Sequence, residues 1–323
     1  MAIWETGWGL DVILWFQSWR TPLVVSIATV FHYLGQIEFL ILVLPIVYWC
    51  VDKRAGRRLG VVVALSAWLN DAIKWWAARP RPYFISEDVL NLVTEDSYGV
   101  PSGHTHGAAT LGGFAAIEAR RAWVTVAAVL YIVLMALSRM ILGVHYPQDV
   151  MLGILVALAV LALYVWLEPP ISRWLPRQTL GTHIGLAAAV SAAMLLVHPI
   201  LFGVTSPPWL PEPLPVYELY EGPLAIPALF FGMGTGIALE WRGVRFSTRG
   251  PVLQRVVRFV VGLAGVAALQ FGLAPALDLL APDSLVLGAA LYALIGLWVG
   301  AGAPWLFVRV GMAPREALPA RQP

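Results

Sequence analysis

Apolar runs of about 20 residues recur along the chain from residue 21 to residue 308, and they constrain the fold more than any other feature. A helix of about that length crosses the hydrocarbon core of a bilayer. Only 12% of the residues are charged, whereas a soluble domain has about 25%. A spanning β-barrel would show alternating segments of about ten residues instead. The sequence therefore predicts an all-α, polytopic transmembrane helix bundle.

We expect ten spans after an amphipathic segment at residues 1–20 that lies in the membrane interface, with Trp4, Trp8, Trp15 and Trp19 as anchors. The spans are predicted at residues 21–34, 36–52, 58–78, 102–119, 122–141, 149–168, 181–203, 223–241, 253–276 and 284–308. The first six form a core at 21–168. The last four form a C-terminal transmembrane extension at 181–323, whose role the sequence leaves open. Five prolines between residues 207 and 215 predict an irregular external loop at 204–222.

Charge predicts the orientation of these spans. If all ten alternate, the basic clusters fall on one side of the membrane, which the positive-inside rule makes cytoplasmic. These clusters lie at residues 52–58, 120–121, 173–177, 242–249 and 309–315. Both termini are then cytoplasmic, and the loop with Glu87, Asp88 and Glu95 is external. No basic stripe predicts a nucleic-acid partner, and the single Cys50 excludes an internal disulfide.

Three polar clusters interrupt the apolar chain. The first holds Lys74 and Arg81-Pro82, the second is Pro101-Ser102-Gly103-His104, and the third holds Ser138-Arg139, His145 and Asp149. Ionisable residues at the membrane edge are costly and are functional candidates by default. The first cluster ends the third span and the second begins the fourth. Two crossings separate the second cluster from the third, so we expect all three on the same, external face.

These residue types suit binding and transfer of a phosphoryl group. Arginine forks and a lysine match phosphate oxygens, and the start of a helix at Ser102 and Gly103 offers free backbone N–H groups to an anion. Asp149 lies four residues after His145 on a first helical turn. It can fix the tautomer of that imidazole and leave the other nitrogen free to attack.

The roles follow from this chemistry. We assign His145 as the nucleophile, Asp149 as its orienting carboxylate and His104 as the general acid for the leaving oxygen. The expected phosphate-binding residues are Lys74, Arg81, Ser102, Gly103 and Arg139.

Two rival chemistries use the same residues. His104, His106, His145 and Asp149 could bind zinc, although three cations aimed at one pocket argue against a metal. Ser102 with a histidine could act as an intramembrane serine hydrolase, although a hydroxyl nucleophile needs no triple cation. Among the other histidines, His32, His183 and His198 are interpreted as interface or packing residues. His106 either faces a helix or solvent, or contacts substrate.

The three clusters resemble the signature of the type 2 phosphatidic acid phosphatase superfamily of integral membrane lipid phosphatases. The matching residues are Lys74 with Arg81-Pro82, then Pro101-Ser102-Gly103-His104, then Ser138-Arg139 with His145 and Asp149. The resemblance covers roughly residues 20–168, and we recognise no motif in residues 180–323. It implies a phosphohistidine at His145 assisted by Asp149, leaving-group protonation by His104, and phosphate binding by Lys74, Arg81, Ser102, Gly103 and Arg139. It also implies that no metal or other cofactor is needed.

The sequence thus predicts a membrane phosphatase that hydrolyses an isoprenoid or glycerolipid phosphate or diphosphate. Its partners are the lipid substrate and the bilayer, and the expected location is a bacterial inner membrane with the active site on the periplasmic face. Three alternatives stay open: a phosphotransferase that passes the phosphate to a lipid or sugar, a sugar-phosphate phosphatase, and a non-catalytic lipid transporter. The sequence leaves the headgroup and the oligomeric state undetermined.

Overall fold

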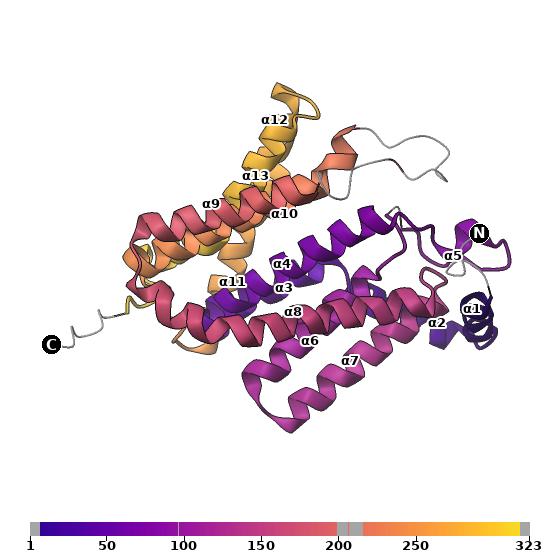
Figure 1. The fold of residues 1–323 in the computed structure, drawn as a ribbon. Helices are drawn as coiled ribbons and strands as arrows, with labels where there is room; N and C mark the ends of the chain where they lie inside the picture. Colours follow the sequence, from indigo (N-terminus) through magenta and orange to yellow (C-terminus); the bar gives the residue numbers. More distant parts are fainter. Residues whose placement is uncertain (1–6, 96, 199–205, 207–215, 317–323) are drawn as a thin grey trace. The chain divides into compact units, whose positions relative to one another are not determined.

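The computed structural model describes residues 7–95, 97–198, 206 and 216–316, and its regular elements are helices (Figure 1). The α-helices are α1 (Trp8–Ser18), α2 (Pro22–Leu34), α3 (Ile37–Pro45), α4 (Lys53–Ala77), α5 (Pro82–Ile85), α6 (Gly103–Ala119), α7 (Ala122–Ile141), α8 (Pro147–Trp174), α9 (Leu180–Val197), α10 (Val216–Leu239), α11 (Val252–Ala267), α12 (Ala274–Leu280), α13 (Leu285–Leu297) and α14 (Ala303–Arg309). A 3-10 turn and several π-helical turns extend or join them: η1 (Ile46–Val51), η2 (Leu175–Arg177), η4 (Glu240–Val244), η5 (Ala268–Leu273) and η6 (Trp298–Gly302).

Each of the ten predicted spans corresponds to a helix or a continuous helical run, which confirms the all-helical class. Within the described residues, six runs are long and apolar enough to cross a membrane: Ala122–Ile141, Pro147–Arg177, Leu180–Val197, Gly222–Val244, Val252–Leu280 and Leu285–Arg309. Two shorter apolar helices lie at Pro22–Leu34 and Leu42–Val51. Helices α4 and α6 match the two remaining predicted spans but are not among these six runs. Ten crossings therefore stay a prediction.

One predicted boundary in the second half was wrong. Helix α10 begins at Val216, inside the irregular loop predicted at 204–222, whereas the predicted end of the preceding span at residue 203 lies outside the described residues. Proline does not stop α10, which contains Pro223 and Pro227. Proline is tolerated inside membrane-spanning helices. Ser191 Oγ on α9 donates to the Pro227 carbonyl at 2.9 Å and so links α9 to α10. The prolines at 207–215 lie outside the described residues.

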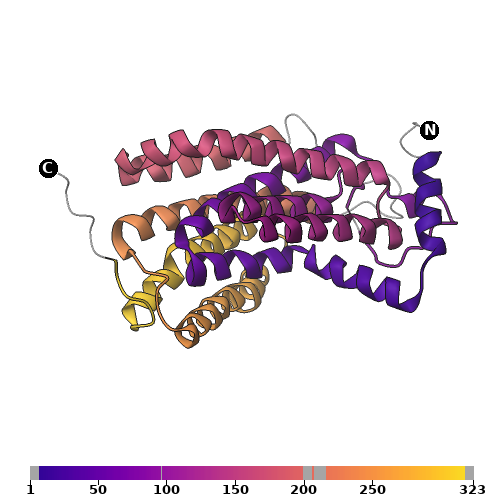
Figure 2. The same cartoon turned by 90° about the horizontal axis from the view of Figure 1, so that it is seen from below.

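The N-terminal helix is amphipathic, as predicted. Trp8, Trp15 and Trp19 are exposed on one side of α1, while Ile13 and Gln17 are buried on the other; Trp4 lies outside the described residues. Both views show α1 lying across the ends of α2 and α7 (Figures 1 and 2). An exposed tryptophan face across the helix ends suits a helix in the membrane interface.

The chain divides into two compact units. The first comprises residues Met1–Leu40, Leu65–Pro169 and His198–Leu219, and the second comprises Ile41–Ala64, Pro170–Val197 and Tyr220–Pro323. In the first unit α7 packs against both α6 and α2. The close α6–α7 pair depends on Gly112, where a Cβ would lie 3.2 Å from the Ala128 side chain. Tyr131 on α7 donates to the Leu34 carbonyl at the end of α2 at 2.7 Å.

The second unit is held by contacts between distant parts of the sequence. Tyr48 and Trp49 in η1 donate to the carbonyls of Gly300 and Val299 in η6, at 2.9 and 3.0 Å. Helix α10 packs backbone to backbone against the α13–η6 run, because a Cβ on Gly236 would lie 2.9 Å from the Gly300 Cα. Small residues allow such close approach between membrane helices.

Candidate active site

The three polar clusters meet in the first unit, as counting the predicted crossings suggested. Arg81 Nη1 of the first cluster lies 3.1 Å from His145 Nε2 of the third. The backbone N–H of Ser102, in the second cluster, donates to the Asp149 carbonyl at 3.0 Å. One backbone bond and one side-chain contact therefore connect residues that lie up to 64 positions apart in the sequence.

A tight turn between α7 and α8 presents His145 to the site. Gly143 adopts φ +75°, and a Cβ there would lie 2.4 Å from the Leu90 carbonyl, so the turn requires glycine. Helix α8 then begins at Pro147 and places Asp149 in its first turn, as predicted. The Asp149 carboxylate accepts from the Tyr146 backbone N–H at 2.9 Å.

The contacts of His145 fix the tautomer of its buried imidazole. A guanidinium group only donates hydrogen bonds, so Nε2 must accept from Arg81 and carries a lone pair. The ring proton is then on Nδ1, which faces Asp149 Oδ2 at 3.5 Å. Catalytic hydrogen bonds are often long in a free site and shorten when the ligand binds. In this arrangement Nε2 is the ring nitrogen that carries the lone pair.

Burial is the main cause that lowers the pKa of His145 well below its ordinary value of 6.5. The positive charges of Arg81, Lys74 and Arg139 act in the same direction. Each of these effects disfavours the protonated imidazole. His145 is therefore neutral, and able to attack, in solutions more acidic than those in which an ordinary histidine stays neutral.

Arg81 and Lys74 approach the site from the end of α4 and the segment after it. Arg81 Nε donates to the Ser97 carbonyl at 2.8 Å and Nη2 donates to the Ser97 hydroxyl at 3.0 Å. Lys74 Nζ donates to the Tyr98 carbonyl at 2.5 Å. The loop before α6 thus holds both cations.

Arg139 enters from the last turn of α7 and is completely buried. Its Nε donates to the Ser138 hydroxyl and its Nη1 donates to His32 Nδ1, both at 3.1 Å. Its Nη2 has no hydrogen-bond partner among the described residues. A buried guanidinium nitrogen left unpaired is costly, so Nη2 is available to an oxyanion.

The start of α6 supplies Ser102 and Gly103. Ser102 occupies the N-cap position, but its hydroxyl makes no capping bond and lies 3.1 Å from Thr105 Oγ1. A Cβ on Gly103 would lie 3.4 Å from Asn70 Oδ1 and 3.8 Å from Lys74 Cε, so this backbone faces the lysine. Helix α8 approaches the start of α6 closely at Gly153. A Cβ at that position would lie 2.8 Å from the Ser102 carbonyl, so this approach requires glycine.

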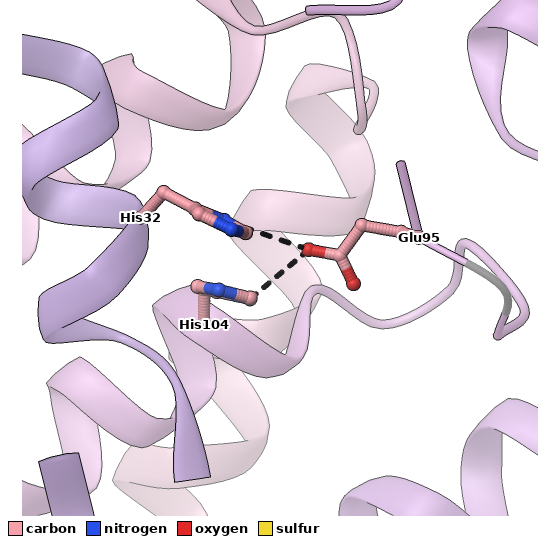
Figure 3. A group of neighbouring side chains, drawn as sticks. All are labelled: His32, Glu95 and His104. Carbon is pink, nitrogen blue, oxygen red and sulfur yellow. Dashed lines mark ion pairs between the residues drawn. The ribbon is translucent and has the colours of Figure 1, made fainter. Parts of the chain in front are cut away.

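His104 points into a cluster that includes two residues missed by the sequence analysis. Its Nδ1 lies 3.6 Å from Glu95 Oε1, and its ring stacks on His32 with centroids 5.0 Å apart and planes 14° from parallel. Figure 3 shows both imidazoles facing the same Glu95 oxygen. The other Glu95 oxygen lies 3.4 Å from Arg81 Nη2.

The packing interpretation of His32 was therefore wrong. It lies in the site because α2 packs against α7 and brings its ring to Arg139. Glu95 was predicted only as an external acidic residue. Neither residue is part of a sequence motif. His32 reaches the site through helix packing, and Glu95 reaches it through the path of the loop before α6.

The remaining histidines lie away from the reacting groups. His106 faces helix α4, where its Nε2 lies 2.6 Å from the buried Ser66 hydroxyl. His183 contacts the Leu175 carbonyl at 2.8 Å and stacks on Trp241. His198 pairs with Asp71 at 3.1 Å. The packing interpretation of His183 and His198 is confirmed, and His106 takes the helix-facing alternative.

A metal fits this cluster poorly. The predicted zinc set fails because His106 is bonded to Ser66 instead. His32, Glu95 and His104 bring possible ligand atoms within 4.8 Å of one another. However, Arg139 Nη1 lies 3.1 Å from His32 Nδ1 and 3.7 Å from Glu95 Oε1, so a fixed positive charge already contacts two of the three ligand atoms. These residues suit an anion and a proton better than a second cation.

Two family models match the chain. The model described as the PAP2 superfamily matches residues 55–173, and the model described as the PAP2 superfamily phosphatase, transmembrane extension, matches residues 224–315. The second match extends the resemblance into the half of the chain where the sequence analysis found no motif. The chain is accordingly a multi-pass integral membrane protein.

Curated relatives at low sequence identity are named as lipid phosphatases. Lipid phosphate phosphatase delta of Arabidopsis thaliana is 22% identical over 81% of this chain and 65% of its own length. Sphingosine-1-phosphate phosphatase 2 of Mus musculus is 26% identical over 64% of this chain and 55% of its own length. Phosphatidylglycerophosphatase B of Bacillus subtilis is 27% identical over 48% of this chain and 80% of its own length. The chain thus spans between half and two thirds of the two eukaryotic relatives.

Among solved structures, the crystal structure of Aquifex aeolicus LpxE is 26% identical to this chain. The match covers 51% of this chain and 99% of that one, with a TM-score of 0.47.

Proposed function

Because this chain belongs to the PAP2 superfamily, we propose that it is a membrane phosphatase that hydrolyses a lipid phosphate or diphosphate through a phosphohistidine at His145. The arrangement of His145 supports this proposal more than any other observation. Its Nε2 lone pair faces Arg81, its Nδ1 faces Asp149, and the ring is buried. A neutral imidazole held in this tautomer is a ready nucleophile.

Substrate binding exchanges one set of contacts for another. The phosphate oxygens take the guanidinium groups of Arg81 and Arg139 and the ammonium group of Lys74, and Arg81 then releases His145 Nε2. The Ser102 hydroxyl and the free N–H groups at the start of α6 bind the same anion. Phosphoryl transfer needs mainly positioning and charge stabilisation, and these groups provide both.

The reaction then proceeds in two steps. His145 Nε2 forms a bond to phosphorus as the phosphorus–oxygen bond to the lipid breaks, and His104 gives its proton to the leaving lipid oxygen. Asp149 stabilises the positive charge on the phosphorylated imidazole. In the second step, water gives a proton to His104 and attacks phosphorus, so phosphate leaves and both histidines return to their starting states.

The names of the relatives support a lipid substrate. The mouse relative is named for sphingosine 1-phosphate and the Bacillus relative for phosphatidylglycerophosphate, and both names denote lipid phosphate monoesters. We therefore place lipid phosphate monoesters first among the candidate substrates of this chain, and lipid diphosphates second.

We further propose that the site faces the exterior of the cell, the periplasm in a bacterium, with both termini cytoplasmic. The basic clusters at residues 52–58 and 120–121 support this orientation, because they lie at the opposite ends of α4 and α6 from the site. In the same proposal, residues 21–168 form the catalytic core and residues 181–323 form a C-terminal transmembrane extension.

The direct test is phosphate release by the purified protein in detergent. The panel contains sphingosine 1-phosphate, phosphatidylglycerophosphate, phosphatidic acid, an isoprenyl diphosphate and glucose 6-phosphate, with the His145→Ala variant as the blank. We expect release from at least one lipid phosphate without any acceptor, and inhibition by vanadate. Release from glucose 6-phosphate alone, or equal release by the variant, would overturn the proposal.

A further inference from the structure

Each of the two proposed catalytic histidines faces a carboxylate at the same ring nitrogen. His145 Nδ1 lies 3.5 Å from Asp149 Oδ2, and His104 Nδ1 lies 3.6 Å from Glu95 Oε1. The first pair lies within one helical turn and follows from sequence spacing. The second pair joins α6 to the loop before it, and neither the motifs nor the family resemblance assigns a role to Glu95.

His104 is the imidazole that is able to donate a proton to Glu95 Oε1. His32 also faces this oxygen, at 3.9 Å (Figure 3). However, His32 Nδ1 accepts a hydrogen bond from Arg139 at 3.1 Å, so that nitrogen has no proton to give. The stacked His32 ring instead forms a flat wall that limits the orientations of His104.

Glu95 is held in place by residues around its loop. Its backbone carbonyl accepts from the Tyr83 hydroxyl at 2.8 Å, and its Oε2 contacts Arg81 at 3.4 Å. Leu90, five residues earlier in the same loop, is bonded by the buried Gln17 side chain of α1. The Gln17 amide accepts from the Leu90 N–H at 3.0 Å and donates to the Leu90 carbonyl at 2.8 Å. This carboxylate therefore keeps its position beside His104.

The negative charge of Glu95 suits a contact with a protonated His104. A general acid must hold a proton before the leaving oxygen takes it, and a protonated His104 adds a positive charge next to Arg139 and Arg81. The Glu95 carboxylate contacts all three groups, at 3.6, 3.7 and 3.4 Å. The other ring nitrogen, His104 Nε2, is buried without a hydrogen-bond partner in the part of the chain that the structure describes.

We propose that Glu95 is the positioning residue of the general acid. It accepts the Nδ1 proton of His104 in a hydrogen bond, stabilises the imidazolium and thereby directs Nε2–H at the leaving lipid oxygen. Glu95 thus does for His104 what Asp149 does for His145. The inference rests on the proposed phosphatase function, in which His104 protonates the leaving group.

Leaving-group dependence tests this role. The test compares two substrates with alkyl chains of the same length. One is an alkyl phosphate, whose alkoxide leaves only when it is protonated. The other is an alkyl-substituted nitrophenyl phosphate, whose nitrophenolate leaves without protonation. General acid catalysis is worth about 10²- to 10⁴-fold. For Glu95→Gln we expect kcat/KM to fall by roughly 100-fold or more with the alkyl substrate and by less than about 3-fold with the nitrophenyl substrate. The quantity kcat/KM includes only the steps up to phosphohistidine formation.

Three controls make the result specific. Glu87→Gln changes an exposed glutamate of the same loop and should leave both substrates unaffected. Glu95→Asp should recover part of the alkyl rate, because it keeps the charge. His104→Ala should show the same leaving-group dependence, and the double variant should be no worse than either single variant.

Several outcomes would overturn the inference while leaving the phosphatase function intact. In the first, Glu95→Gln slows both substrates equally or neither, while the wild type hydrolyses both. In the second, EDTA removes activity and zinc restores it, which would make His32, Glu95 and His104 metal ligands. A wild type that hydrolyses neither substrate refutes the proposed function instead, so the two failures are distinguishable.

Discussion

Arg81 makes two sets of contacts that determine the resting state of the site. One set fixes the guanidinium on Ser97, and the other places Nη1 3.1 Å from His145 Nε2. The proposed nucleophile, His145, therefore has its Nε2 lone pair covered by Arg81 in the free site. Its opposite nitrogen faces Asp149, so the proposed role of His145 depends on that carboxylate.

Replacing Asp149 by Asn should lower kcat by about 100-fold or more while substrate still binds. The amide offers His145 Nδ1 no negative charge to stabilise the phosphorylated imidazole, and an oriented base of this kind is typically worth about 10²- to 10⁴-fold. Steady-state kinetics on a lipid phosphate would measure the effect. Asp88→Asn, an exposed change in the loop before α6, is the control. An Asp149→Asn enzyme within 2-fold of the wild type would contradict the role.

The protonation state of His145 gives a second prediction. Burial and the neighbouring cations lower its pKa well below 6.5, so the neutral form persists as the pH falls through 6.5. In the protein labelled with ¹⁵N-histidine, the His145 side chain should still be neutral at pH 6.5, where an ordinary imidazole is half protonated. Its signal should be missing from the His145→Gln protein. A His145 that is half protonated at or above pH 6.5 would refute the burial argument.

At the scale of elements, a few glycines determine how closely the helices that carry the site approach one another. The helices themselves could be predicted from the recurring apolar runs of about 20 residues. Their close contacts could not, because a glycine in sequence gives no sign of the backbone that will face it. Gly153 is such a case, since its missing side chain admits the Ser102 carbonyl.

Gly153→Ala should separate α8 from the start of α6. An added Cβ would lie 2.8 Å from the Ser102 carbonyl and 3.4 Å from the His106 N–H group. The Ser102–Asp149 backbone bond would stretch, and we expect kcat/KM to fall by about 10-fold or more, since misplacement of about 1 Å can cost about 100-fold. Gly185→Ala, where a Cβ meets nothing within 4 Å, should keep full activity. Equal activity of both variants would show that this approach is unimportant.

For the whole molecule, the sequence predicted the helical class, the approximate place of all ten helices and the meeting of the three clusters. It could not predict that His32 and Glu95 join them, because α2–α7 packing and a loop path determine that contact. The sequence also does not indicate that Tyr48 and Trp49 contact η6 in the second unit. Such contacts depend on which helices become neighbours, and the apolar runs of a sequence do not specify which helices will pack together.

The proposed orientation predicts which sites are accessible from outside the cell. The one cysteine, Cys50, is buried, so labelling of introduced cysteines has a low background. In intact cells, a membrane-impermeant maleimide should label Asp88→Cys but not Arg54→Cys, and both should react after permeabilisation. The reverse pattern would place the active site in the cytoplasm.

The central claim is that His145 carries the phosphoryl group during turnover. The enzyme would be mixed with lipid phosphate, quenched within milliseconds in alkali and digested for mass spectrometry, with a parallel quench in acid. We expect a phosphoryl group on His145 that survives alkali, is lost in acid and is missing from the His145→Ala protein. An acid-stable phosphoryl group on Ser102, or turnover without any phosphorylated residue, would contradict the account.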